Sequence, residues 1–145
     1  PLEGDFKATG HPVVELMVCS DAPDCDFVAK LVDSYPPSPD HPRGFAVGIS
    51  EGIQRAKFRN GNKKPELMSP GEICLIRIAM RPLANLFKTG HRIRLDITSS
   101  SWPHFDINTH TGRNPSEDHE RRTAHHTIFH EKNSASKLLL PGDYV

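Results

Sequence analysis

The sequence has no long apolar run and no excess of either charge. Its 145 residues contain no apolar stretch close to the ~20 residues that a membrane-spanning helix needs, so we expect no membrane partner. Lysine and arginine (18) balance aspartate and glutamate (18), so no net field attracts nucleic acid. We interpret the one basic cluster as a solvated strand face and turn, and expect no nucleic-acid partner. Its members are Arg55, Lys57, Arg59, Lys63 and Lys64.

Cysteine is also scarce. Cys19, Cys25 and Cys74 are too few and too scattered for a disulfide framework, and their odd number suits a reducing compartment. The first residues lack the charged-then-apolar layout of a signal peptide. We therefore expect a cytoplasmic protein, although a mature or excised secreted fragment would also lack its signal.

Helical periodicity is nearly missing, and strand periodicity takes its place. Alternating apolar and polar residues between turn-forming segments predict about eight strands. These are 13–20, 27–35, 45–49, 53–59, 73–80, 91–98, 123–130 and 137–140. No segment offers the crossover helices of about ten or more residues that a parallel sheet requires. The predicted fold class is therefore all-β, a β-sandwich or a jelly roll.

Three segments are expected to lie outside these strands. Residues 1–12 begin with a proline and are interpreted as a linker or boundary. Residues 81–88 are predicted to form one helical turn that crosses between two sheets. Residues 108–122 are polar and are predicted to form a long exposed loop.

The stretch His91–Asp106 is interpreted as the one around which the chain is organised. Its apolar residues alternate with polar ones and are expected in the middle of the core; they are Ile93, Leu95 and Ile97. Three serines then lead to Trp102, the only tryptophan. Two interpretations of Trp102 stay open. It caps the core beneath a loop, or it faces a partner surface or a pocket together with Phe105.

One motif resembles a catalytic site. Gly48-Ile49-Ser50-Glu51-Gly52 matches the G-x-S-x-G nucleophile elbow, with Asp and His residues later in the chain. An elbow needs a helix after the serine, whereas residues 53–59 have strand periodicity. We therefore interpret the motif as a hairpin turn that uses two glycines. A stand-alone esterase that uses Ser50 is the alternative.

No metal ion or cofactor is expected. Among the close-set His125, His126 and His130, the last two would lie about 13 Å apart on one strand face, too far to share an ion. Asp21, Asp24 and Asp26 could offer oxygens to Ca²⁺, but the EF-hand pattern is missing. Aspartates in a turn commonly accept hydrogen bonds from their own backbone.

Three segments resemble a known family. They are 18–31 (VCSDAPDCDFVAKL), 52–59 (GIQRAKFR) and 87–106 (FKTGHRIRLDITSSSWPHFD). They resemble the C-terminal, non-catalytic domain of the serine hydrolase family that contains cocaine esterase, Xaa-Pro dipeptidyl-peptidase and α-amino-acid ester hydrolase. The resemblance runs in register from about Pro1 to Pro141. Cys19 and Cys25 depart from it, because the family more often has a hydroxyl residue there.

The resemblance implies a galactose-binding-domain-like jelly roll over 1–145. This would be a single domain from the C-terminal part of a longer hydrolase, with its first strand partly missing. The family's catalytic triad lies outside this segment, so no catalytic residue is carried over. The implied partners are the α/β-hydrolase and cap domains of the same parent chain, with oligomer contacts as a further role. The parent would cleave esters, amides or peptides.

Site residues follow from the resemblance in two groups. Candidates for the domain interface or cleft are Trp102, Phe105 and Asp106. Structural motif residues are Asp21, Asp24, Asp26, Arg55, His91 and Arg94. The alternative function is a jelly-roll carbohydrate-binding module, for which the available aromatic residues are Trp102, Tyr35, Phe105 and Tyr144.

Overall fold

The chain is an all-β protein in this computed structural model, which describes residues 1–114 and 116–145. The described residues form ten strands and one short 3₁₀ helix, η1. Their bounds are β1 Phe6–Gly10, β2 Val13–Ser20, β3 Asp26–Tyr35, β4 Phe45–Arg55, η1 Ala56–Phe58, β5 Cys74–Ala79, β6 Leu83–Phe87, β7 Arg92–Thr98, β8 His126–Ile128, β9 Lys137–Leu139 and β10 Gly142–Tyr144. Within this part of the chain, no helix has the length and apolar character needed to cross a membrane.

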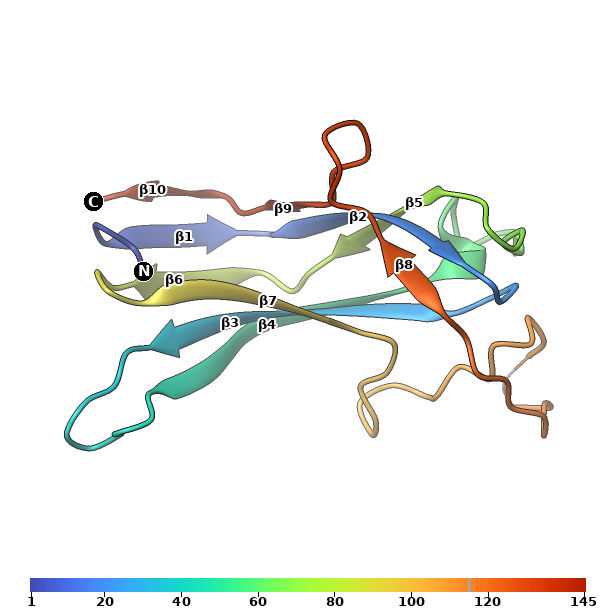
Figure 1. Cartoon of the computed structure of the whole chain (residues 1–145), viewed down its shortest axis with the longest axis horizontal. Helices are drawn as coiled ribbons and strands as arrows, with labels where there is room; N and C mark the ends of the chain where they lie inside the picture. Colours follow the sequence, from blue (N-terminus) through green and yellow to red (C-terminus); the bar gives the residue numbers. More distant parts are fainter. Residues whose placement is uncertain (115) are drawn as a thin grey trace.

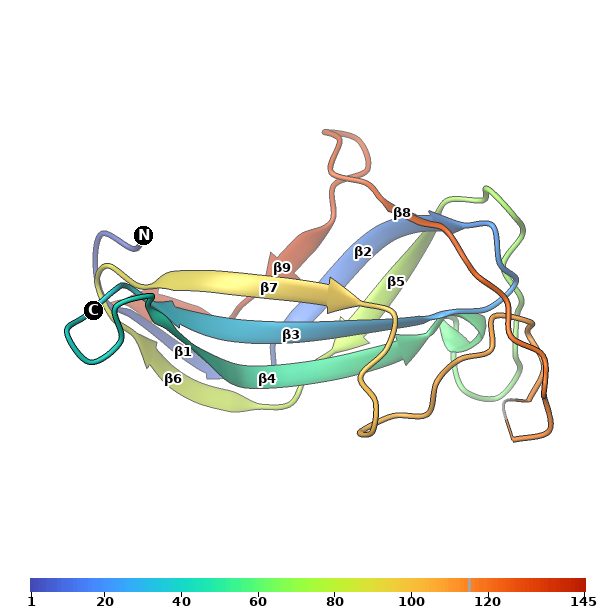
Figure 2. The ribbon, with the colours of Figure 1, turned by 60° about the horizontal axis from the view of Figure 1, so that its bottom comes forward.

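The strands pair into three antiparallel sheets (Figure 1). Their orders are β10-β1-β6, β5-β2-β8 and β4-β3-β7, and β9 also pairs with β2. In Figure 2 the β4-β3-β7 sheet forms one layer, and β2 and β5 cross behind it. The predicted all-β sandwich is confirmed.

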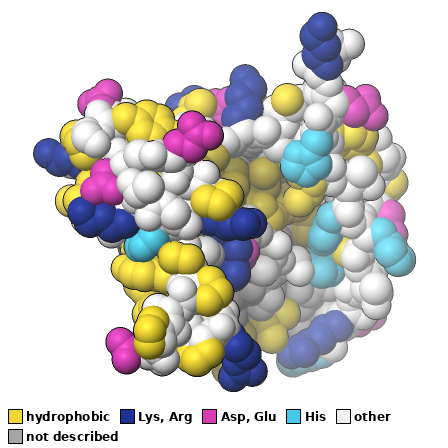
Figure 3. Space-filling view, turned by 60° about the vertical axis from the view of Figure 1, so that its left-hand side comes forward, with side chains coloured by type: hydrophobic (Ala, Val, Ile, Leu, Met, Phe, Trp, Pro, Cys, Tyr) yellow, Lys and Arg dark blue, Asp and Glu magenta, His cyan; other side chains and the backbone are white. Residues whose placement is uncertain are grey.

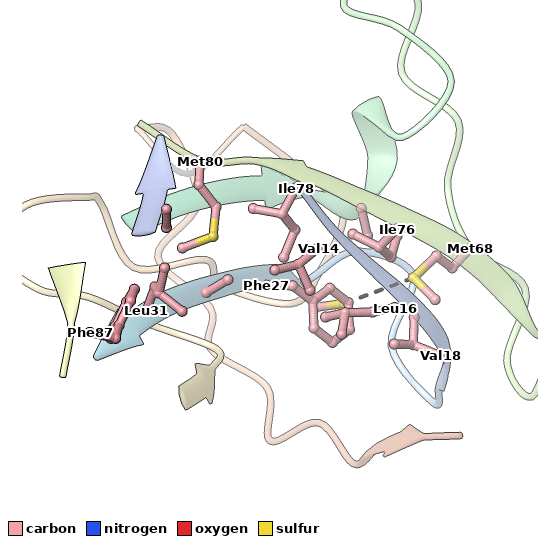
Figure 4. Close-up of a cluster of buried hydrophobic side chains, with 14 residues drawn as sticks. Val14, Leu16, Val18, Phe27, Leu31, Met68, Ile76, Ile78, Met80 and Phe87 are labelled. Atoms are coloured by element: carbon pink, nitrogen blue, oxygen red, sulfur yellow. Dashed lines mark hydrogen bonds between the residues drawn. The ribbon is translucent and has the colours of Figure 1, made fainter. Parts of the chain in front are cut away.

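The core lies between β2, β3 and β5, because each of these strands carries an apolar residue at every second position. The buried side chains gather in the space between the two layers (Figure 4). They include Val14, Leu16 and Val18 of β2, Phe27, Ala29 and Leu31 of β3, and Ile76 and Ile78 of β5. The alternation predicted for residues 13–20 and 27–35 is therefore confirmed.

The Gly48–Gly52 motif lies inside a strand, so the predicted hairpin turn is wrong. β4 is one strand from Phe45 to Arg55; Ser50 pairs with Leu31 of β3 and Gly48 with Val32, so the register shifts by one residue at Ile49. Gly52 has a different reason to be glycine: a Cβ atom there would lie 2.4 Å from the carbonyl oxygen of Ala79. This glycine permits close approach of two strands rather than a turn.

Two segments expected to be irregular form strands. Residues 81–88 contain β6 instead of a helical turn, and residues 1–12 contain β1 instead of a linker alone. The two strands pair with each other, from Phe6 opposite Phe87 to Gly10 opposite Leu83. Each has only five residues, so the sequence pattern was too short to distinguish a strand from a turn.

β7 is an edge strand, so the strand expected at the centre of the fold lies at its side. Ile93, Leu95 and Ile97 are only partly buried and contact the core from one flank. The centre of this sheet is β3, which pairs with both β4 and β7. A hollow lined by hydrophobic side chains opens between β7 and the β8–β9 segment (Figure 3). On the side of this hollow opposite β7, the partly buried hydrophobic residues are Ile128, Leu138 and Leu140.

Candidate functional site

Residues 99–110, which follow β7, carry all three predicted interface residues; we call them the Trp102 loop. They contain no strand or helix. In Figure 1 this segment leaves the sheet at the end far from the two termini. Its conformation is therefore fixed by turn hydrogen bonds, such as the one from the His104 N–H to the Ser101 carbonyl at 2.9 Å, and by side-chain contacts rather than by a β ladder.

Asn108 ties the loop to the β2–β3 turn. Its side-chain amide donates hydrogen bonds to Asp24 Oδ2 at 3.1 Å and to Asp26 Oδ1 at 2.9 Å. Both carboxylates are 1% exposed, and Asn108 is 5% exposed. One amide thus contacts two buried negative charges, which would be costly to bury without such donors.

Two cations complete this buried network. Arg55 donates to Asp26 through Nε and Nη2, both at 2.8 Å, and this pairing raises the pKa of the guanidinium. The backbone N–H of Lys57 donates to Asp24 at 3.0 Å, and its ammonium lies 3.3 Å from the same carboxyl group. We call Asp24, Asp26, Arg55, Lys57 and Asn108 the anchor network.

A second set of contacts holds the chain just before β8. Asp21 accepts hydrogen bonds from the backbone N–H and the ring of His125, both at 2.9 Å, and these lower the pKa of the Asp21 carboxyl. His126 contacts the hydroxyl of Ser20 at 3.0 Å. The three aspartates therefore bind three distant parts of the chain instead of their own turn.

The loop presents its aromatic residues at the surface. Trp102 is 68% exposed, Phe105 is half-buried, and Asp106 is exposed. Trp102 and Asp106 border a hollow of about 470 Å³. Phe105 and Asp106 border another, of about 280 Å³, next to Asp26 and Arg55 of the anchor network. The interpretation of Trp102 as a cap on the core is therefore wrong.

His91 and Arg94 lie elsewhere. His91 is buried immediately before β7, and its Nδ1 lies 2.9 Å from Asp33. Arg94 forms an exposed bidentate pair with Asp96 of its own strand, at 2.9 and 2.7 Å. The structure does not bring either residue to the anchor network.

The aromatic residues named for a carbohydrate surface do not lie together. Tyr35 ends β3 and Tyr144 ends β10, at the end of the molecule that holds the termini (Figure 1). Trp102 and Phe105 belong to the loop at the other end. No shared aromatic surface joins these four residues.

Ser50 is held as a structural residue. Its hydroxyl donates to the carbonyl oxygen of Arg81 at 2.7 Å from a position inside β4. A strand, and then only the three residues of η1, follows it, so the strand-turn-helix geometry of an elbow is missing. Within residues 1–114 and 116–145, no group of three or more His, Cys, Asp or Glu side chains could hold a metal ion.

Sequence reasoning missed Asn108, and it wrongly placed Lys57 on a solvated strand face, because Lys57 is 7% exposed and lies in η1. Asn108 and Thr109 are buried, so residues 108–122 are not the fully exposed loop that was predicted. The two aspartates that bind Asn108 lie 82 and 84 residues away, and no local pattern encodes such a contact. An asparagine among polar loop residues gives no signal by itself.

Comparisons with known proteins agree with the resemblance. The family model described as the X-Pro dipeptidyl-peptidase C-terminal non-catalytic domain matches residues 1–139. The cocaine esterase of Rhodococcus sp. (strain MB1 Bresler) is 38% identical over 111 residues, which are 77% of this chain and 18% of the esterase. The chain thus spans about a fifth of the length of that relative.

Solved structures share the fold. An α-amino acid ester hydrolase superposes with a TM-score of 0.88 and 24% identity, covering 99% of this chain and 24% of that one. An aminopeptidase from the marine sediment archaeon Thaumarchaeota archaeon gives 0.87 and 24%, with the same coverage. Together with the match over residues 1–139, these findings identify the chain as a member of the X-Pro dipeptidyl-peptidase C-terminal non-catalytic domain family.

Proposed function

We propose that this chain is part of a serine hydrolase that cleaves esters or amides, and that it packs on the α/β-hydrolase domain through the Trp102 loop. In this position the loop helps to wall the active site. The observation that carries the proposal is the 68% exposure of Trp102 on a loop whose base is fixed by buried charges. Tryptophan is enriched among the residues that contribute most to protein interfaces, so an exposed tryptophan on a fixed loop is a candidate contact residue.

The anchor network supports this role. An interface residue contributes more binding free energy when its loop is already ordered, because the loop loses less conformational entropy when the partner binds. Here two ion pairs and an amide fix the base of the loop, and Trp102 projects from it. The half-buried Phe105 and the exposed Ile107 and Asp106 would surround the tryptophan in the contact.

The test compares two exposed aromatic residues in the full-length hydrolase. Trp102→Ala should lower kcat/KM for an ester substrate or lower the melting temperature of the parent. Tyr144→Ala is the matched control, because Tyr144 is 66% exposed at the opposite end of the domain. If the two variants behave alike, the Trp102 loop is not the contact surface.

We also propose that residues 1–145 form one domain, which a strand from elsewhere in the parent completes at the edge of β7. β7 ends its sheet, and the hydrophobic hollow lies beside it. Leu2 is held next to the start of this strand: its N–H donates to His91 at 2.8 Å and its C=O accepts from Gly90 at 2.9 Å. Amides of β7 should exchange hydrogen more slowly in the parent than in this chain. Equal exchange rates would contradict the added strand.

A cytoplasmic location completes the proposal. All three cysteines are free thiols, and burial together with Asp24 and Asp26 raises the pKa of Cys25 to about 12. Titration of the protein purified without reductant should find three thiols after unfolding. Finding only one free thiol would indicate a disulfide and contradict the reducing location.

A further inference from the structure

A small pocket lies on the outer face of the β4-β3-β7 sheet, separate from the two hollows of the Trp102 loop. Its volume is about 290 Å³. On β3, Lys30 and Val32 alternate with the core residues Ala29 and Leu31, so they point away from the core. The lining residues are Lys30, Val32, Gly48, Ile49, Ser50, Glu51, Arg81 and His104.

The lining is apolar where β3 and β4 meet. Val32 is only 6% exposed although it lies on the outer face of the sheet. Gly48 leaves space beside it, because a Cβ atom added there would meet no atom within 4 Å. A short aliphatic group would therefore contact Val32 and Ile49 without displacing a side chain.

Cationic groups outnumber carboxylates around this lining. Glu51 lies 3.7 Å from the guanidinium of Arg81 and 3.4 Å from the ring of His104, so two basic groups share one carboxylate. Lys30 lies opposite Asp96 of β7 and opposite Glu51 of β4 in the two ladders, but Asp96 is held by Arg94 at 2.7 Å and Glu51 lies next to Arg81 and His104. In the described part of the chain, Lys30 has no carboxylate within 4.0 Å.

The backbone of Arg81 is fixed at the rim. Its N–H donates to the carbonyl of Glu51 at 3.0 Å, and its own carbonyl accepts from Ser50 Oγ at 2.7 Å. The Arg81 side chain remains 71% exposed, so its N–H donors are available to a ligand. The hydrogen bond from Ser50 Oγ to the Arg81 carbonyl also explains why the Ser50 hydroxyl is buried there.

We propose that this pocket binds a small aliphatic monocarboxylate. The carboxylate accepts hydrogen bonds from Lys30 and Arg81, which are charge-assisted and therefore stronger than neutral ones. The aliphatic tail lies on Val32 and Ile49 in the space beside Gly48. An apolar surface with a few converging polar groups is the usual composition of a small-molecule site.

The test uses sodium isobutyrate as the probe on the ¹⁵N-labelled chain at constant ionic strength. Amide signals of Gly48, Ser50 and Glu51 should shift and saturate, with a dissociation constant of order 1 mM for a ligand of about six heavy atoms. Isobutyramide, which has the same shape without the charge, should bind at least about threefold more weakly. Equal binding of the amide, or no saturation by roughly 50 mM, would overturn the proposal.

Variants assign the contacts. Lys30→Gln and Arg81→Gln should each weaken isobutyrate binding about threefold to fivefold, because exposed ion pairs contribute modestly. Gly48→Val should abolish binding by filling the pocket. Arg77→Gln is the control, since Arg77 is 64% exposed on β5, outside the pocket lining. If the valine variant does not fold, the two glutamine variants decide: unchanged affinity in both contradicts the site.

Discussion

At the scale of single residues, the anchor network explains why two carboxylates are buried. Asp24 and Asp26 are each 1% exposed and would lose much hydration energy without partners. Arg55, Lys57 and Asn108 together supply donors to both. Buried pairs of this kind add little net stability, but removing one partner leaves an uncompensated charge.

Arg55→Ala is expected to destabilise the chain by about 3–5 kcal/mol, because it leaves Asp26 buried without its bidentate partner. Arg94→Ala is the matched control: it removes an exposed bidentate pair and should cost under about 1 kcal/mol. Urea unfolding followed by circular dichroism measures both. Similar small losses in the two variants would show that the Asp26 pair is not needed for the fold.

His126 makes stability depend on pH near neutrality. Burial, and then the neighbouring His110, lower its pKa from the ordinary value of 6.5, so folding favours the neutral ring. Its Nε2 is buried without a hydrogen-bond partner in the described structure, and its ring packs edge-to-face with Phe27 and with His110. The nearby groups that influence its charge are His110, Asp21 and His125.

The sign of the effect follows from proton uptake. As pH falls through about 6.5, the unfolded chain protonates this histidine before the folded chain does, so the free energy of unfolding decreases. The melting temperature should therefore be lower at about pH 5.5 than at about pH 7.5. His126→Gln should reduce this difference, whereas His11→Gln, at an exposed site, should not. A full pH response in His126→Gln would assign the effect to other groups.

At the scale of elements, strand position decides how much a buried leucine matters. Leu31 of β3 and Leu95 of β7 are paired directly across the ladder. Leu31 is 0% exposed in the central strand, whereas Leu95 is only partly buried in the edge strand. The same side chain therefore removes less apolar surface from water at the edge.

Leu31→Ala should cost about 2–5 kcal/mol, the usual range for a fully buried leucine. Leu95→Ala should cost distinctly less, because water already reaches one side of it in this chain. Denaturant midpoints of the two variants compare them directly. An equal loss would mean that the flank of β7 is as tightly packed as the centre of the sandwich.

At the scale of the whole molecule, the surface that carries Trp102 is separate from the hydrophobic core. Trp102 projects from the anchored loop, and the core cluster lies between β2, β3 and β5 without it. The fold and the proposed contact surface can therefore change independently. This separation is what a domain that assists a neighbouring domain requires.

Trp102→Ala should change the stability of this chain by under about 0.5 kcal/mol, as is usual for an exposed side chain. Leu31→Ala serves as the reference for a core loss. Thermal unfolding of the chain checks this. Melting as severe as that of Leu31→Ala would place Trp102 in the core and contradict its role at an interface.

The sequence alone determined the strand character and the fold class. The alternation in Val13–Ser20 and Asp26–Tyr35 arises from local chain geometry, because every second side chain points to the same face. The three segments around Asp21, Arg55 and Trp102 were likewise sufficient to indicate the family. These signals need no knowledge of which strands are neighbours.

Only the tertiary structure decided which strand is central and what the polar residues contact. The pattern of Ile93, Leu95 and Ile97 is the same for a central and an edge strand, since the difference depends on a partner strand far away in the sequence. In the sequence, Gly52 is equally consistent with a turn and with a close approach of two strands. The position of the Ala79 carbonyl oxygen, which leaves no space for a Cβ atom, shows that it is the close approach. Asn108 and Lys57 acquired roles because folding brought Asp24 and Asp26 to them, and buried charges must find donors wherever the chain supplies them.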